Sequence, residues 1–392
     1  MKHECTLETS TDSDRELTEL TRLEEDAADM SESAADVREE ELRAGWSGAV
    51  QIKERVLYNW VLSCRFGQPY PVIVDPRRRR RRMWVHPLLR QRLTKGHFHR
   101  LYASLQTHPN KFYQYCRMSL ATFNILLETV RPGITFQETR IRKCISAEER
   151  LLLTLRFLTT DLSYAALHYE FLIRKTTISG IVRSTCSEIW SRLHQVVMPE
   201  PKKEDWLRLS CGFEDTCQFP QCIGALDGKH IHVHKPPNSG SQFYNYKQYF
   251  SVVLLALVDS HYRFIIVDIG AYGFTGHSRV FNSSIVGQRL LNNQLDLPPP
   301  RQLPGTNIDP VPYVLVADEA FQLTRHVMRP YPRRILDHRR RIFNLLLSRA
   351  RRLVECAFGI LCAKWRILQS AIQLSEANVN EVFKAWGYSM AR

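Results

Sequence analysis

Three carboxylates occupy positions that suit metal-dependent chemistry. Asp227 lies inside a short apolar segment, Asp318 ends another, and Glu355 lies within a helical run. A carboxylate inside an apolar strand is costly unless it has a partner, so each aspartate requires one. Two Mg²⁺ or Mn²⁺ ions, held about 3.5–4 Å apart by such oxygens, can activate water and stabilise the leaving oxygen of a phosphodiester. The residue types therefore favour metal-dependent cleavage of a phosphodiester.

The segments that must position these carboxylates follow the order β-β-β-α-β-α. Three short, apolar, β-branched segments predict an antiparallel meander, and a helix and a proline-rich loop then precede a fourth buried strand and a closing helix. The order resembles that of RNase H-like nucleases, with a mixed sheet flanked by helices. The expected strands are 222–233, 250–259, 263–270 and 313–321, and the expected helices are 283–291 and 345–368.

Each carboxylate also has a structural interpretation. Asp227 precedes Gly228 and Lys229, so a hydrogen-bonded aspartate in a turn is an alternative there. Three carboxylates in the correct topological order make this alternative weaker.

A helical region precedes the expected sheet. Ser146 is placed to cap an apolar helix at 147–159, and two further helical segments at 163–171 and 173–182 are joined by a tight turn. This pattern is typical of a helix-turn-helix, whose second helix enters the major groove by its N-terminal end. The groove-facing candidates are Lys175, Thr176, Thr177 and Ser179. A three-helix bundle that serves only packing has the same pattern.

The net charge of +14 is unevenly distributed. Residues 1–44 carry a net charge of −10, so the rest of the chain carries +24. The acidic tail lacks the apolar content needed for a core, and we expect it to be mostly disordered. The basic remainder includes six consecutive arginines, Arg77–Arg82, followed by Arg90, Arg92, Lys95 and Arg100. Such a run favours nucleic-acid contact or nuclear import, and a solvated charge run is the alternative.

Cysteine and histidine groups give weaker signals. The ten cysteines form no paired framework, and the polar N-terminus does not resemble a signal peptide, so we expect reduced thiols in the nucleus, with the cytoplasm as the alternative. No apolar run approaches the roughly 20 residues of a membrane span. Two groups could hold zinc, but neither has a usual spacing. They are Cys211, Cys217 and Cys222, and the alternating His230, His232 and His234.

Four stretches together resemble the PIF/Harbinger transposase family, which includes the Harbinger transposase-derived nucleases of the DDE superfamily. They are residues 224–231, 246–259, 316–323 and 343–361, and the similarity extends over roughly 80–380. The resemblance implies an RNase H-like domain acting on DNA, a divalent metal, and a triad at Asp227, Asp318 and Glu355. It also implies a separate Myb-like DNA-binding partner, and we add the expectation of a homo-oligomer.

Two features depart from the family pattern. Many relatives carry a further aspartate in a loop where this chain has His277, which we expect to be an exposed loop histidine. The chain also ends with 386–392, where relatives continue with an apolar helix. If the missing aspartate assists metal binding, this chain binds metal more weakly or binds a different metal.

Arginines surround the second half of the expected site. Arg351 and Arg352 precede Glu355 by one helical turn, so they are placed to pair with it or to hold a DNA phosphate. Arg333, Arg334, Arg339, Arg340 and Arg341 lie between Asp318 and Glu355 and suit backbone phosphates, with a solvated basic loop as the alternative.

The expected architecture is α+β, with a helical DNA-binding region before the catalytic domain. We expect an acidic tail at 1–44, a basic helical or linker region at 45–116, a helix-turn-helix-like region at 117–200 and an RNase H-like domain at 201–392. The leading function is a metal-dependent DNA nuclease. The alternatives are a catalytically silent DNA-binding or adaptor protein with the same fold, and a transcription factor that acts through the helix-turn-helix without metal.

Overall fold

The computed structural model describes residues 85–138, 143–372 and 382. All described residues belong to one compact unit. The expectations for the acidic tail, for the arginine run and for the chain end after Val382 lie outside the described residues.

The first described part is helical. Three serines begin helices as their sequence context predicts: Ser119, Ser146 and Ser163 each accept a hydrogen bond from the backbone N–H three residues later. Leu172 ends one helix in the left-handed conformation. The helices are α2 (Pro87–Arg90), α3 (Arg92–Lys95), α4 (His97–Gln106), α5 (Pro109–Cys116), α6 (Leu120–Ile134), α7 (Ala147–Thr160), α8 (Tyr164–Phe171) and α9 (Lys175–Val197).

One core joins the early and late helices of this part. Leu105 of α4 and Phe112 of α5 are buried in the same cluster as Phe123 of α6, Leu155 of α7 and Ile178 of α9. The expected division between 116 and 117 is therefore not a boundary in the packing, because α4 and α5 contribute to the core of the helices that follow.

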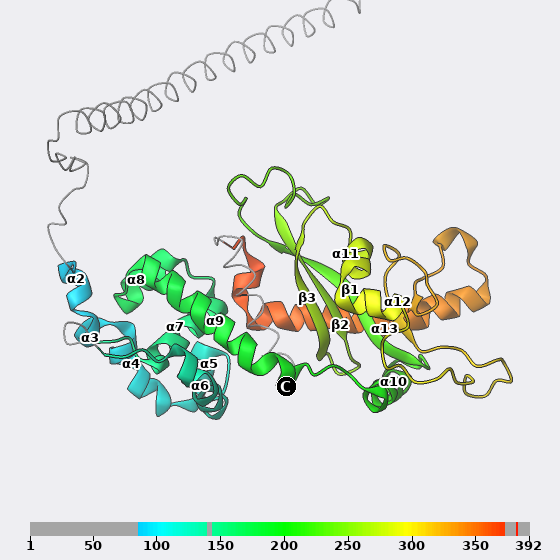
Figure 1. The fold of residues 1–392 in the computed structure, drawn as a ribbon, viewed down its shortest axis with the longest axis horizontal. Helices are drawn as coiled ribbons and strands as arrows, with labels where there is room; N and C mark the ends of the chain where they lie inside the picture. Colours follow the sequence, from blue (N-terminus) through cyan, green and yellow to red (C-terminus); the bar gives the residue numbers. More distant parts are fainter. Residues whose placement is uncertain (1–84, 139–142, 373–381, 383–392) are drawn as a thin grey trace, which may run out of the picture. The chain divides into compact units, whose positions relative to one another are not determined.

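The second described part is built on a five-stranded mixed sheet in the order β3-β2-β1-β4-β5 (Figure 1). The first three strands form the predicted antiparallel meander, and β4 and β5 continue the sheet in parallel from β1. The strands are β1 (Cys222–His232), β2 (Ser251–Val258), β3 (Phe264–Tyr272), β4 (Val314–Val316) and β5 (Val327–Met328).

Helices cover both faces of the sheet, because its central strands are apolar on both sides. All eight residues of β2 are buried, and successive residues alternate between two core clusters. Val252 and Leu254 contribute to the cluster that includes α13 (His338–Lys364), whereas Val253 and Leu255 contribute to the cluster that includes α11 (His277–Ser283). This is the mixed α+β arrangement that the sequence predicts for an RNase H-like domain.

Several elements differ from the predicted ones. Helix α13 begins seven residues before the predicted start at 345, because Asp337 caps it by accepting the N–H of Arg340 at 2.7 Å. Helix α11 and the short strand β5 were not predicted, and β4 is shorter than the expected segment. The remaining elements are α10 (Lys203–Cys217), α12 (Ile285–Leu291) and the 3-10 helices η1 (Arg333–Ile335) and η2 (Arg366–Gln369).

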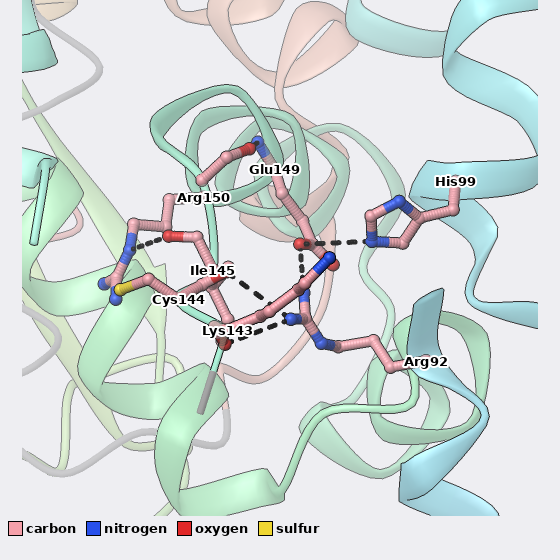
Figure 2. A network of polar contacts seen from close by, with 8 residues as sticks. Arg92, His99, Lys143, Cys144, Ile145, Glu149 and Arg150 are labelled. Atoms are coloured by element: carbon pink, nitrogen blue, oxygen red, sulfur yellow. Dashed lines mark hydrogen bonds and ion pairs between the residues drawn. The ribbon is translucent and has the colours of Figure 1, made fainter. Parts of the chain in front are cut away.

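A buried ion pair joins the first helices to α7 (Figure 2). Arg92 donates to Glu149 at 2.5 Å, and the two side chains are only 12% and 1% exposed. Arg92 also reaches the carbonyls of Lys143 and Cys144, and His99 lies 3.7 Å from the same carboxylate. Burial raises the pKa of Glu149, and the charge of Arg92 opposes that rise. Arg92 was counted among the cations for nucleic acid, but its guanidinium is committed to this internal contact.

We expect Arg92→Ala to lower the free energy of unfolding by about 3–5 kcal/mol, because it leaves the Glu149 carboxylate buried without its cation. Chemical denaturation of the full chain measures the change. Adding Glu149→Gln to this variant should restore part of the loss. Arg208→Ala, which removes an exposed pair with Asp205, is the matched control and should cost about 0–1 kcal/mol. Equal effects of the two arginine substitutions would contradict the assignment.

Candidate metal-dependent active site

Asp227 lies in the middle of the central strand β1, where it is largely buried. Its neighbours Ala225 and Leu226 are in the core, and its own side chain is 14% exposed. The Asp227 carboxylate accepts the backbone N–H of Gly228 at 2.7 Å. The residue pairs with Ala256 of β2 within an unbroken antiparallel register, so Asp227 lies in a strand and the turn alternative is wrong.

Asp318 and Glu355 reach the same side of the sheet from other elements. Strand β4 pairs in parallel with β1, and Val316 lies opposite Ala225. Asp318 and Asp227 each follow two residues later, so they lie at the same level of the two neighbouring chains. Ala225 and Val316 belong to the core cluster beneath α13. Side chains alternate between the two faces of an extended chain, so Asp227 and Asp318, two residues further along, face the same side. Glu355 projects from α13, whose buried residues pack against β1 and β4.

The three carboxylates interact electrostatically. The pKa of Asp227 is raised from 3.8 to about 6, chiefly by burial. The negative charges of Asp318 and Glu355 raise it further, whereas the Gly228 N–H and the Arg351 charge oppose the rise. The negative charges of two acidic residues that are distant in the sequence therefore act on the Asp227 carboxylate. A divalent cation is the kind of ligand that offsets such repulsion.

The carboxylates do not form a closed ligand cage by themselves. Among the described residues, no group of three or more His, Cys, Asp or Glu side chains lies close enough together to hold a metal ion. Glu355 is 48% exposed and pairs with Arg351 at 2.7 Å. Arg351 thus forms the first of the two contacts that the sequence suggested for it. The donor set suits a hard cation, but Glu355 must leave Arg351 to join it.

His277 differs from the sequence expectation. It was expected to be exposed in a loop, yet it is the first residue of α11 and its side chain is only 12% exposed. Its Nδ1 lies 3.7 Å from Asp227 Oδ1. A Cβ on Gly228 would lie 2.6 Å from the His277 ring, so only glycine permits this approach. The pKa of His277 is lowered, chiefly by burial. The signal that could have identified this contact is the glycine directly after Asp227.

Neither group that sequence spacing suggested for zinc forms a metal site. The three alternating histidines go to different partners: His230 bonds Ser251 Oγ at 3.0 Å, the His232 ring lies against Tyr249, and His234 lies beyond the strand end. Of the cysteines, Cys211 is exposed, whereas Cys217 and Cys222 are buried thiols, and all three are free.

The predicted phosphate-binding arginines lie on ordered helices. Arg333 and Arg334 are exposed in η1, and Arg339 and Arg341 are exposed in the first turn of α13, so these side chains lie on helical turns and are solvated. Arg340 lies over the Tyr331 ring at 5.2 Å. Arg352 is exposed next to the Arg351–Glu355 pair.

The predicted helix-turn-helix corresponds to α8 and α9, and α9 is much longer than predicted. Lys175, Thr176 and Thr177 are exposed at the N-terminal turn of α9. Ser179 is half-buried, and its hydroxyl interacts with Tyr164 of α8, so it is turned toward the neighbouring helix.

A cavity lies apart from the carboxylates. It has a volume of about 430 Å³ and is lined mainly by apolar residues of the face that α11 and α12 cover, including Trp206, Leu255 and Phe281. None of the three carboxylates lines it. This cavity is therefore separate from the candidate site.

The mixed sheet flanked by helices is the arrangement of an RNase H-like DDE domain. Comparison with known families agrees: residues 226–386 match the DDE superfamily endonuclease family. The chain is also similar to a protein named ALP1-like from Arabidopsis thaliana, with 24% identity over 296 residues, covering 72% of this chain and 70% of the relative. The chain is therefore similar to DDE superfamily endonucleases over residues 226–386 and to this relative over most of its length. No solved structure matches it. Among the described residues, no helix is long and apolar enough to cross a membrane.

The raised pKa of Asp227 predicts a specific pH dependence. Since the native pKa of about 6 exceeds the unfolded value of 3.8, ionisation penalises the native state as the pH rises through this window. In EDTA at about pH 7.5, we expect Asp227→Asn to raise the free energy of unfolding by about 1–3 kcal/mol. The gain should vanish below about pH 4, where Asp227 is protonated in both states. Denaturation at several pH values measures it.

The exposed Asp215→Asn is the matched control, and it should change the free energy of unfolding little at any pH. A loss of stability in Asp227→Asn at neutral pH would contradict the electrostatic description of the site.

Proposed function

We propose that this protein is a metal-dependent DNA nuclease of the Harbinger transposase-derived type, with Asp227, Asp318 and Glu355 as its catalytic and metal-binding residues. The observation that carries the proposal is the pKa of Asp227, which burial and the charges of Asp318 and Glu355 raise to about 6. Carboxylates whose negative charges repel one another are characteristic of a divalent-cation site, because the cation neutralises the repulsion. The endonuclease family match supports DNA as the substrate.

The residues of the site have distinct proposed roles. Asp227 and Asp318 would hold Mg²⁺ or Mn²⁺ from two adjacent parallel strands, and Glu355 would complete the ligand set after releasing Arg351. The bound metal supplies activation of water and charge neutralisation at the phosphodiester. The rigid central strand fixes Asp227, and His277 packs against that carboxylate and excludes water from it.

Basic side chains on two helical elements would hold the DNA. On α9, Lys175, Thr176 and Thr177 would enter the major groove by the helix N-terminus, with Ser179 supporting the turn through α8. Arg339, Arg340, Arg341 and Arg352 of α13 would contact phosphates, whose contribution falls steeply with salt. We further propose a nuclear location, a Myb-like DNA-binding partner and a homo-oligomer, which the family resemblance and the basic body of the chain support.

A catalytically silent DNA-binding or adaptor protein is the second candidate. Two observations favour it: Glu355 is engaged by Arg351, and a histidine lies against Asp227. Both candidate functions predict DNA binding, so only a measurement of DNA cleavage distinguishes them.

Plasmid nicking tests the proposal directly. In Mg²⁺ or Mn²⁺ we expect the wild type to relax supercoiled DNA, and EDTA to abolish this activity. Asp318→Asn and Glu355→Gln should each lower the rate by at least about a hundredfold, because a metal ligand contributes several kcal/mol at about 1.4 kcal/mol per tenfold. Asp215→Asn is the control for surface charge. Nicking by Asp318→Asn at the wild-type rate would refute the triad, and a silent wild type would favour the adaptor.

The Arg351–Glu355 pair makes a separate prediction. Arg351→Gln should tighten Mn²⁺ binding about two- to fivefold, because a half-exposed pair that competes with the metal is worth about 0.2–1 kcal/mol. Calorimetric titration measures the affinity, and Arg352→Gln is the neighbouring control. If Arg351→Gln left Mn²⁺ affinity unchanged and weakened only DNA binding, Arg351 would be a phosphate ligand and not a competitor of the metal.

A further inference from the structure

Four large aromatic side chains are exposed beside the candidate active site. Tyr246 is 76% exposed, Phe274 55%, Tyr244 43% and Tyr272 39%. Tyr244 and Tyr246 lie in the loop between β1 and β2, and Tyr272 and Phe274 lie at and after the end of β3. We call these four residues the aromatic edge. An exposed group of large aromatic side chains signals a binding surface.

A row of rings connects the aromatic edge to the carboxylates. The Tyr246 ring lies 5.4 Å from that of His230, and the His230 ring lies 5.1 Å from that of His277. His277 Nδ1 is in turn 3.7 Å from Asp227 Oδ1. The most exposed ring is therefore separated from the central carboxylate by only two imidazoles.

Tyr272 and Phe274 contact the same loop between β1 and β2. Buried Phe243 lies edge-on to Tyr272 at 5.0 Å, and Tyr272 stacks with Phe274 at 6.4 Å and 21° between planes. A Cβ on Gly273 would lie 2.3 Å from the Phe243 carbonyl oxygen, so the glycine allows the end of β3 to approach the loop. The Phe274 N–H also donates to the Gln242 carbonyl at 3.2 Å.

The loop is held by hydrogen bonds from a buried amide. Asn245 is 3% exposed, and it donates to Ser251 Oγ at 2.8 Å while accepting the N–H groups of Lys247 and Tyr249. Ser251 in turn bonds His230 at 3.0 Å. Anchoring from within leaves the rings projecting outward in a fixed position, which lowers the entropic cost of binding a flat ligand.

Two lysines lie close to aromatic rings in this part of the structure. Lys247 Nζ lies 5.5 Å from the Tyr246 ring centre, and Lys235 Nζ lies 5.6 Å from that of Phe250. Burial lowers the pKa of both His230 and His277, and the positive charge of Lys247 lowers both pKa values further. Lys247 is therefore close to both imidazole rings. Exposed rings with adjacent cations suit a ligand that has flat faces and a polyanionic backbone.

We propose that the aromatic edge is a stacking surface for unpaired nucleotides of the DNA strand next to the scissile phosphodiester. The inference rests on the proposed function, since it assigns a substrate form to the same site. Single-stranded DNA is favoured over a duplex because paired bases are stacked inside the helix and offer no free face to Tyr246 or Phe274. Because only two imidazoles separate Tyr246 from Asp227, a strand held on the aromatic edge lies next to the candidate site.

The test is binding of a short single-stranded oligonucleotide and its duplex to full-length protein carrying Asp318→Asn, in EDTA. Fluorescence anisotropy gives the affinity, and quenching of a 2-aminopurine base reports stacking. We expect Tyr246→Ala and Phe274→Ala each to weaken single-strand binding about five- to hundredfold and to reduce quenching, with little effect on the duplex. Tyr246→Phe keeps the ring and should bind like its parent. Tyr113→Ala of α5, which removes a ring that is 55% exposed, is the matched control and should have no effect.

The proposal is overturned if Tyr246→Ala and Phe274→Ala behave like Tyr113→Ala, or if they weaken single-strand and duplex binding equally. It is also overturned if single-stranded RNA or an acidic peptide binds through these rings more tightly than single-stranded DNA. A protein that nicks plasmids but shows none of these stacking effects would retain the proposed function and lose this surface. A protein with the stacking effects but no nicking would retain the surface and lose the nuclease assignment.

Discussion

Burial of the Asp227 carboxylate in the central strand is the constraint on which the site depends. Placed between two cores, this charge cannot be hydrated fully, and Asp318 and Glu355 add repulsion. The fold partly relieves the cost with the Gly228 N–H and the Arg351 charge, and it packs His277 against the same oxygen. These contacts lower the free-energy cost of keeping the carboxylate in the interior of the fold.

Much of this arrangement could be predicted from local pattern. Apolar, β-branched segments at 250–259 and 263–270 predicted strands at nearly their observed bounds. The first of them, β2, is buried on both faces, and such a strand has few sequence alternatives. The order of strands and helices then predicts that Asp227, Asp318 and Glu355 lie on one side of the sheet. Side-chain alternation and the parallel pairing of β1 with β4 leave little freedom in where the two aspartates lie. Ser146 likewise caps its helix where predicted.

The remaining features depend on contacts between residues far apart in the sequence. Nothing near Arg92 indicates that it will neutralise Glu149, so a local reading counts it with the exposed cations. The start of α13 is fixed by the Asp337 cap, although the run of arginines that follows suggests a loop. His277 follows a glycine and precedes a serine, and only the approach of α11 to Gly228 buries it. The turning of Ser179 toward Tyr164 also requires the packed neighbour.

The parallel pairing of β4 with β1 has a consequence for partial chains. Because β4 returns to the centre of the sheet after a crossover, the two strands that neighbour β1, β2 and β4, are separated in the sequence by β3, α11 and α12. A polypeptide interrupted before residue 318 contains a single acid of the triad, and one interrupted before 355 contains two. Partial chains therefore lack one or both of the acidic residues that are proposed to act with Asp227.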